Sequence, residues 1–419
     1  MSSKQNLVNI SHPNDVTTIN SQSECDPTEV GLTSAQVETI WNAIVKCYQS
    51  RLHPAITICI RRHGKIVLNR AIGHTHGNGP NDSSHAEKIR ATPDSLFNLY
   101  SSSKAIAAMM IHHLDEKGLI HLDEPICHYL PEFSEGPKRF ITVRHVLTHH
   151  AGIPKIPANA LDLDNLHTPG AIRKIMANAP MQWAAGRKMG YHAITGGFMM
   201  GELVEAITGM SIREYLHKNF LEPLNFNTFN FGISKDRVSE VAPNVYTGYP
   251  IPQWGENIVT KVLGVTYEEA IEISNDPRFL TGILPAANVI GTAEETSRFY
   301  EMLLRGGELN GVRVLNPETI RRATAEQTHA TFDRMLGLPM RYSLGFMLGR
   351  SRLSLYQGDT PKAFGHLGLI NVVGYADPER DISVGILNNG KPGISTKMIS
   401  FWMALRTIAN TIPKTQAQP

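Results

Sequence analysis

Strand-like segments occur near both ends of the chain, whereas the long middle part carries helical patterns. The runs AITICIRR (55–62) and KIVLNRAIG (65–73) are rich in β-branched residues and flank a short His-Gly turn, which predicts a hairpin. Further strand-like runs follow far downstream, at 342–348, 369–377 and 381–389. This distribution is typical of one sheet built from N- and C-terminal segments, with a helical lobe inserted between them.

Helix boundaries support this division of the chain. The helical segment 33–50 begins with Thr33 as its cap, and the segment 292–307 begins with Thr292 and ends at a Gly-Gly pair. A third helical pattern covers residues 396–412. The predicted units are a mobile N-terminal arm (1–28), a sheet domain (29–98 and 281–412), a mainly helical lobe (99–280) and a short tail (413–419).

The composition is that of an ordinary globular protein, with 42% hydrophobic and 19% charged residues. The 40 basic and 38 acidic residues nearly balance, which argues against a nucleic-acid or anionic membrane partner. We expect no signal peptide at the start of the chain and no membrane span, because no apolar run of about 18 residues occurs. The four cysteines form no C-x-x-C pair, which favours reduced thiols and a cytoplasmic location.

One short motif contains a candidate catalytic serine. The run LYSSSKAIAAMM (99–110) places Lys104 three residues after Ser101, so the two side chains lie one turn apart on a helix that starts near Ser101. A buried lysine loses its charge more easily than an exposed one, and a neutral amine can take the proton of a serine hydroxyl. Serines are also common helix caps, so the tetrad alone leaves a purely structural role open. No G-x-S-x-G is present, which disfavours an α/β-hydrolase nucleophile.

Several blocks of sequence follow this tetrad in a fixed order. They include TPDSLFNLYSSSKAIAA (92–108), ITVRHVLTHHAGIP (141–154), GYHAITGGFMMGELVEAITG (190–209) and FGHLGLINVVGYADPERDISVGILNN (364–389). Over residues 33–410 the chain resembles the serine β-lactamase-like superfamily, which includes class C β-lactamases, DD-peptidases and family VIII carboxylesterases. The resemblance implies an α+β fold of the α/β sandwich type, with a mostly antiparallel sheet flanked by helices and the active site beside the inserted helical lobe.

The resemblance also implies catalytic roles for particular residues. Ser101 would be the nucleophile and Lys104 its proton acceptor. Tyr191 would act as general base and then general acid, with a pKa lowered by the nearby lysine. The backbone N–H groups of Ser101 and Leu369 would form the oxyanion hole.

The third motif of the superfamily reads His366-Leu367-Gly368 in this chain. Gly368 would let the substrate approach the strand edge closely. His366 replaces the lysine that helps hold a substrate carboxylate, and a histidine is at most partly charged near pH 7. Ala193 replaces the usual amide side chain that binds the amide group of the substrate. These two changes weaken recognition of a carboxylate-bearing peptide mimic, so we expect a serine carboxylesterase that works through an acyl-enzyme.

Other functions stay open from the sequence. They are a β-lactamase or D-amino-acid peptidase, a transacylase and a non-catalytic binding protein on the same scaffold. We expect no cofactor and no metal, because His145, His149 and His150 match no zinc-site pattern. The expected partner is a small-molecule ester, and a homo-oligomer is compatible with the sequence. Met340 and Met347 near the last strands serve either as core filling or as part of a soft acyl pocket.

Overall fold

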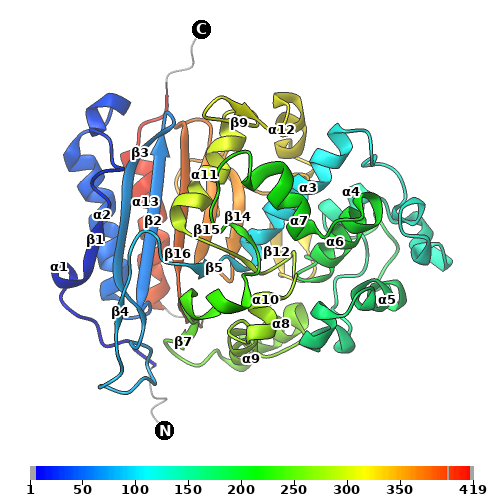
Figure 1. The fold of residues 1–419 in the computed structure, drawn as a ribbon, viewed down its shortest axis with the longest axis horizontal. Helices are drawn as coiled ribbons and strands as arrows, with labels where there is room; N and C mark the ends of the chain where they lie inside the picture. Colours follow the sequence, from blue (N-terminus) through cyan, green and yellow to red (C-terminus); the bar gives the residue numbers. More distant parts are fainter. Residues whose placement is uncertain (1–5, 394–395, 416–419) are drawn as a thin grey trace.

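The computed structural model describes residues 6–393 and 396–415, and its main feature is a ten-stranded sheet (Figure 1). The strand order is β1-β3-β2-β16-β15-β14-β13-β12-β11, with β4 paired to β3 off this path, and neighbouring strands run antiparallel. These strands are β1 (Thr17–Ile19), β2 (Ala55–Arg62), β3 (Lys65–His76), β4 (Ile89–Arg90), β11 (Thr328–Asp333), β12 (Leu338–Tyr342), β13 (Met347–Leu348), β14 (Phe364–Gly368), β15 (Val372–Asp377) and β16 (Ile382–Asn388). The pairing of β2 with β16 joins the two ends of the chain in one sheet, which confirms the expected fold class.

Helices cover the sheet and make up most of the inserted lobe (Figure 1). They are α1 (Pro13–Val16), α2 (Ser34–Gln49), α3 (Ser103–Glu116), α4 (Val143–Leu147), α5 (Ala171–Asn178), α6 (Thr195–Thr208), α7 (Ile212–Leu216), α8 (Gln253–Leu263), α9 (Tyr267–Ile273), α10 (Pro277–Thr281), α11 (Ala293–Leu304), α12 (Pro317–Thr324) and α13 (Ile399–Thr411). The remaining strands form three small sheets. The first contains β5 (Phe97–Asn98), β6 (Asn230–Phe231) and β8 (Val289–Gly291). The second pairs β7 (Val245–Thr247) with β17 (Gly390–Pro392), and the third pairs β9 (Glu308–Leu309) with β10 (Val312–Arg313).

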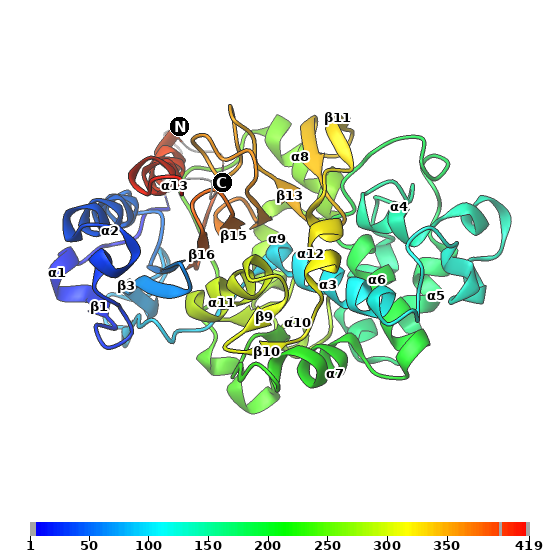
Figure 2. The ribbon, with the colours of Figure 1, turned by 90° about the horizontal axis from the view of Figure 1, so that it is seen from above.

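Alternating side chains of β2 pack against different helices on the two faces of the sheet. Ile56, Ile58 and Ile60 belong to the hydrophobic cluster that includes α2 and α13, whereas Cys59 belongs to the cluster that includes α11 and α3. Successive side chains of a strand point to opposite faces, so a strand between two helical layers is apolar throughout. Figure 2 shows α2 and α13 together on one side of the strands and α11 on the other.

Local sequence signals set several of these boundaries. The hydroxyl of Thr33 accepts a hydrogen bond from the N–H of Gln36 at the start of α2, and Thr292 caps α11 in the same way. The predicted hairpin is β2 and β3, and both residues of its turn, His63 and Gly64, adopt positive φ angles, as a two-residue hairpin turn requires. These predictions are confirmed.

The strand-like run 342–348 is not one strand. It contains the end of β12, a turn, and the short strand β13. Gly345 has a φ of +109°, and a Cβ there would lie 2.2 Å from the Cβ of Ala108 on α3. The chain therefore turns where it touches α3, a long-range contact that the local pattern does not reveal.

The N-terminal segment is not a free arm within its described part, residues 6–28. The strand β1 pairs with β3 at the edge of the sheet, and Val8 is completely buried. The prediction of a mobile arm was wrong there because a three-residue edge strand has too little periodicity to be recognised. Residues 1–5, and residues 416–419 of the predicted tail, lie outside the described residues.

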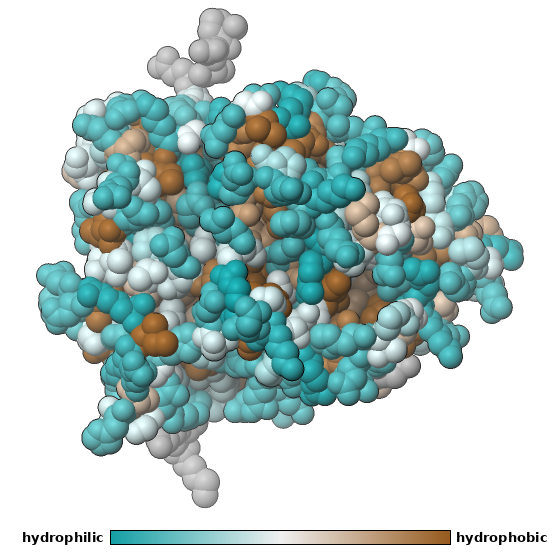
Figure 3. All heavy atoms as spheres, in the orientation of Figure 1, coloured by the Kyte–Doolittle hydropathy of each residue, from teal (hydrophilic) through white to brown (hydrophobic). Residues whose placement is uncertain are grey.

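The helical lobe and the sheet share one hydrophobic core. The cluster that contains most of α3 continues to Phe299 on α11 and Phe364 on β14. The proposed domain boundaries at residues 98 and 280 therefore stay a prediction. The face of the molecule drawn in Figure 3 is mostly hydrophilic, with hydrophobic groups scattered over it.

Candidate active site

The structure brings Ser101 and Lys104 into contact at the start of α3. Lys104 Nζ lies 3.0 Å from Ser101 Oγ and donates a second hydrogen bond, also of 3.0 Å, to the carbonyl oxygen of Ala286. Lys104 is only 3% exposed, and burial lowers its pKa well below the usual range of lysine. No acidic side chain of the described chain forms an ion pair with Lys104, so burial acts without an opposing charge. A neutral amine placed in this way can accept the proton of Ser101.

The three consecutive serines have three different environments. Ser101 lines a large pocket. Ser102 donates a hydrogen bond of 2.8 Å to the carbonyl oxygen of His366, which ties the turn before α3 to β14. The hydroxyl of Ser103 accepts a hydrogen bond of 2.9 Å from the N–H of Val289 on β8. The second and third serines therefore anchor the turn that carries the first, and sequence reasoning found no role for Ser102.

The backbone before Ser101 adopts a special conformation. Tyr100 has a φ of +47°, which non-glycine residues rarely adopt, and its hydroxyl hydrogen-bonds to Ser274 Oγ at 2.7 Å. The side chain of Asn98 accepts a hydrogen bond from the N–H of Tyr100 at 3.1 Å. Surrounding contacts thus hold a sharp turn that presents Ser101 to the pocket.

Tyr191 lies beside this pair. Lys104 Nζ is 5.0 Å from the centre of the Tyr191 ring, and the phenol forms a hydrogen bond with Ser101. Burial raises the pKa of Tyr191, and the hydrogen bond with Ser101 lowers this pKa by a smaller amount. The expected lowering of this pKa by the lysine is therefore wrong, because burial is the largest effect on Tyr191 and raises its pKa. Tyr191 is a phenol near pH 7, suited to donate or relay a proton.

A buried aspartate that sequence reasoning missed holds Tyr191 in place. Asp333, at the end of β11, accepts hydrogen bonds on Oδ1 from the backbone N–H groups of Tyr191, Met335 and Leu336. Its side chain is completely buried. It lies 142 positions away from the tyrosine, and no local pattern marks it.

Of the third motif, Leu367 lines the pocket, whereas His366 and Gly368 do not. His366 is 1% exposed, and burial lowers its pKa to about 3. His366 is therefore neutral and does not line the pocket, and Ala193, which is 2% exposed, does not line it either. The structure does not support the expected direct substrate contacts of these two residues.

Gly368 has a different neighbour from the expected one. A Cβ at this position would lie 2.1 Å from the carbonyl oxygen of Leu99, so the glycine admits the protein's own backbone rather than a substrate. The close approach places the turn of Ser101 next to the end of β14. Leu369 and Ile370 follow with φ angles of +37° and +76°, and both line the pocket with Ser101.

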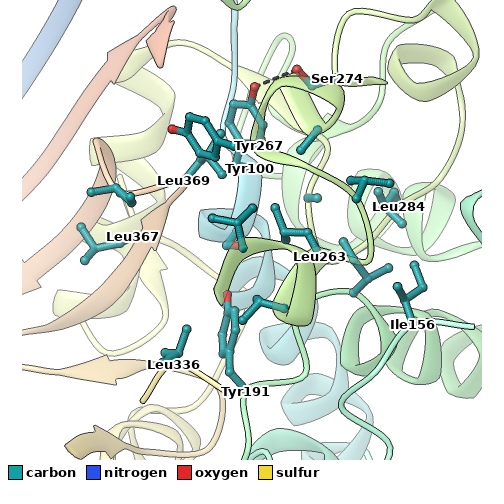
Figure 4. A pocket seen from close by; sticks show the side chains of 18 of the residues that line it. Tyr100, Ile156, Tyr191, Leu263, Tyr267, Ser274, Leu284, Leu336, Leu367 and Leu369 are labelled. Atoms are coloured by element: carbon teal, nitrogen blue, oxygen red, sulfur yellow. Dashed lines mark hydrogen bonds between the residues drawn. The ribbon is translucent and has the colours of Figure 1, made fainter. Parts of the chain in front are cut away.

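The pocket beside Ser101 and Tyr191 is an apolar cavity of about 450 Å³ (Figure 4). Among the described residues that line it there is no Asp, Glu, Lys, Arg or His. Met340 and Met347 both contribute to its wall. Much of another wall comes from α8 and α9, in a region where the sequence pattern was too mixed to predict elements.

The histidines of the 141–154 block have structural roles. His145 Nδ1 accepts a hydrogen bond from the N–H of Thr142 at the start of α4, and His149 Nδ1 accepts one from the N–H of His192. Over the described residues, no group of His, Cys, Asp and Glu side chains is arranged to hold a metal ion. All four cysteines are free thiols, as predicted. Within the same part of the chain, no helix has the length and hydropathy needed to cross a membrane.

Known proteins resemble this chain over most of its length. A family model described as Beta-lactamase matches residues 41–399. Esterase/beta-lactamase LipL of Mycobacterium tuberculosis is 28% identical over 310 residues, which cover 71% of this chain and 70% of LipL.

Two solved structures share the fold. A penicillin-binding protein homologue from Caulobacter crescentus has a TM-score of 0.76 at 23% identity, over 91% of this chain and 99% of its own. A family VIII carboxylesterase has a TM-score of 0.74 at 24% identity, over 90% of this chain and 98% of its own. With the family model covering most of the sequence, the chain belongs to the beta-lactamase family, within a superfamily of serine hydrolases.

Proposed function

We propose that this protein hydrolyses uncharged carboxylic esters through an acyl-enzyme on Ser101. The observation that carries the proposal is the contact of Ser101 with a buried lysine of lowered pKa, at a pocket without a charged side chain among its described lining residues. The neutral lysine activates the hydroxyl, and the pocket takes the ester.

The proton steps follow from the charge states of the two neighbours. Lys104 accepts the proton of Ser101 as Oγ attacks the ester carbonyl. The backbone N–H groups of Ser101 and Leu369 stabilise the oxyanion that forms. Tyr191 gives its proton to the leaving alkoxide and takes one back from Lys104, so both groups return to neutral. Water then attacks the acyl-enzyme, releases the acid, and returns a proton to Ser101.

The pocket favours esters over β-lactams and peptides that end in a carboxylate. Burying a carboxylate without a cation is costly, and the described pocket wall offers none. His366 is neutral and buried, so it does not supply the missing charge. The relative LipL carries both activities in its name, which makes the comparison of substrates informative.

The test compares p-nitrophenyl butyrate with nitrocefin on the wild type, Ser101→Ala and Ser102→Ala. We expect faster turnover of the ester, and a loss of at least about 10³-fold in Ser101→Ala. Ser102→Ala removes a neighbouring hydroxyl that anchors the turn to β14, so it should lose far less activity than Ser101→Ala and shows what disturbing the turn alone costs. Full activity of Ser101→Ala, or preferential opening of the β-lactam, would overturn the proposal. Product analysis with an added alcohol separates hydrolysis from transacylation.

A further inference from the structure

The pocket extends to both sides of the reacting groups. On one side it is lined by Met340, Met347 and Leu367 of β12, β13 and β14, which we name the sheet arm. On the other side it is lined by Leu163, Phe279 and Leu284 from the helical lobe, which we name the lobe arm. Figure 4 shows Leu367 and Leu369 on one side of Tyr191, and Leu284 and Ile156 on the other.

We propose that the two arms bind the two halves of the ester, so that the substrate joins an apolar acid to an apolar alcohol. This inference rests on the proposed function and names its substrate class. An ester carbonyl beside Ser101 has one substituent on each side, so a pocket that continues in both directions can bury both of them. The volume of about 450 Å³ is in the range of sites for drug-sized ligands.

The two arms are separate apolar surfaces. Met340 and Met347 belong to a small hydrophobic cluster that also contains Tyr191, and Leu367 packs against it. Leu284 and Phe279 belong to the large core of the helical lobe. Because different hydrophobic clusters build the two arms, we expect a substitution in one arm to disturb the packing of the other less.

The hydroxyl groups of the wall are already engaged within the protein. Tyr100 and Ser274 hydrogen-bond to each other, Ser274 donates to the carbonyl oxygen of Ile271, and Tyr267 donates to that of Pro392. Ser101 and Tyr191 are the hydroxyl-bearing residues left for the substrate among the described lining. Apart from Ser101, Tyr191 and the indole N–H of Trp402, the described lining offers no side-chain partner to a sugar, a glycerol or a charged head group, which would lose its hydration here. This excludes esters with a polar acid or a polar alcohol from the preferred class.

Burial of each added methylene on this surface is worth about fourfold in kcat/KM until an arm is full. The test therefore uses two substrate series with the wild-type chain. One varies the acyl chain of p-nitrophenyl esters from acetate to decanoate, and the other varies the alcohol of alkyl butyrates from methanol to decanol, followed by acid release. We expect kcat/KM to rise with chain length in both series.

Variants in the arms separate the two halves of the ester. Leu284→Trp fills the lobe arm and Met340→Trp fills the sheet arm. We expect each variant to lose about 10²-fold on the long members of one series only, measured relative to its own kcat/KM on the shortest member of that series. Leu284→Ala and Met340→Ala enlarge the same arms and should shift the preferred length upward, which keeps the test valid if a tryptophan prevents folding.

The outcomes distinguish this inference from the proposed function. A flat dependence on chain length in either series, or equal losses in both series from both variants, would refute the two-armed pocket while ester hydrolysis stands. A preference for glyceryl or sugar esters would refute the proposal that the alcohol half of the substrate is apolar. A wild type that hydrolyses no ester of either series would refute the proposed function itself.

Discussion

Replacing Lys104 with methionine tests whether this lysine is neutral in the folded protein. Methionine has a similar length and shape but carries no titratable group. Burial lowers the pKa of Lys104 in the folded state, and in the unfolded chain the pKa returns to about 10.4. Between these two values the unfolded chain holds a proton on residue 104 that the folded chain does not. Unfolding therefore takes up one proton in the wild type and none at this position in the variant.

The sign and size of the effect follow from this difference. Stability rises with pH wherever the unfolded state binds more protons, by about 1.36 kcal/mol per pH unit for one proton. From the lowered pKa up to about 10.4, the wild type should thus gain stability relative to Lys104→Met, by roughly 2.7 kcal/mol over two pH units. The variant also loses the hydrogen bond to the Ala286 carbonyl, which lowers its free energy of unfolding by an amount that does not change with pH.

The assay is urea unfolding of both proteins at half-unit steps from pH 7.5 to 9.5, with ester hydrolysis measured in parallel. Lys391→Met should show the same slope, because burial also lowers the pKa of that fully buried lysine. The exposed Lys155→Met controls for the loss of a positive charge. Lys104→Met should lose about 10³-fold in kcat. A stability difference that stays constant with pH would show a charged Lys104 and refute the neutral-base reasoning.

Other substitutions test the neighbours of the pair. Tyr191→Phe keeps the ring and removes the hydroxyl, so kcat for esters should fall about 10² to 10⁴-fold with little change in KM, and an unchanged kcat would contradict the proton relay. Asp333→Ala leaves three backbone N–H groups, two of them in buried hydrogen bonds, without an acceptor and should lower the free energy of unfolding by about 3 kcal/mol, whereas Asp333→Asn should recover part of it, both measured in urea. Gly368→Ala places a methyl group against the Leu99 carbonyl and should lower kcat/KM at least about 10²-fold, and wild-type activity would show that this contact does not position Ser101.

Much of the secondary structure could be predicted because its signals are local. Thr33 and Thr292 cap helices through residues three positions away, and the His63-Gly64 turn joins adjacent strands. The edge strand β1 and the turn at Gly345 could not be predicted in the same way. Both depend on contacts with segments that lie far away in the sequence.

The candidate site, too, could be predicted only where its signals are local. Ser101 and Lys104 could be paired from the sequence because a helix brings residues three apart onto one face. The roles of Ser102 and Asp333 were missed, since their partners lie 264 and 142 positions away. The apolar walls contributed by α8 and α9 were missed because their short, mixed pattern does not show what they pack against.

The sequence by itself determined the antiparallel sheet built from both ends of the chain, and it nominated Ser101 with Lys104 as the reacting pair. Caps, turns and helical spacing act over a few residues, so they can be read along the chain. Only the tertiary structure decided that burial lowers the pKa values of Lys104 and His366 and that the pocket is lined by apolar side chains. These properties depend on burial, and burial is produced by segments that meet only when the whole chain has folded.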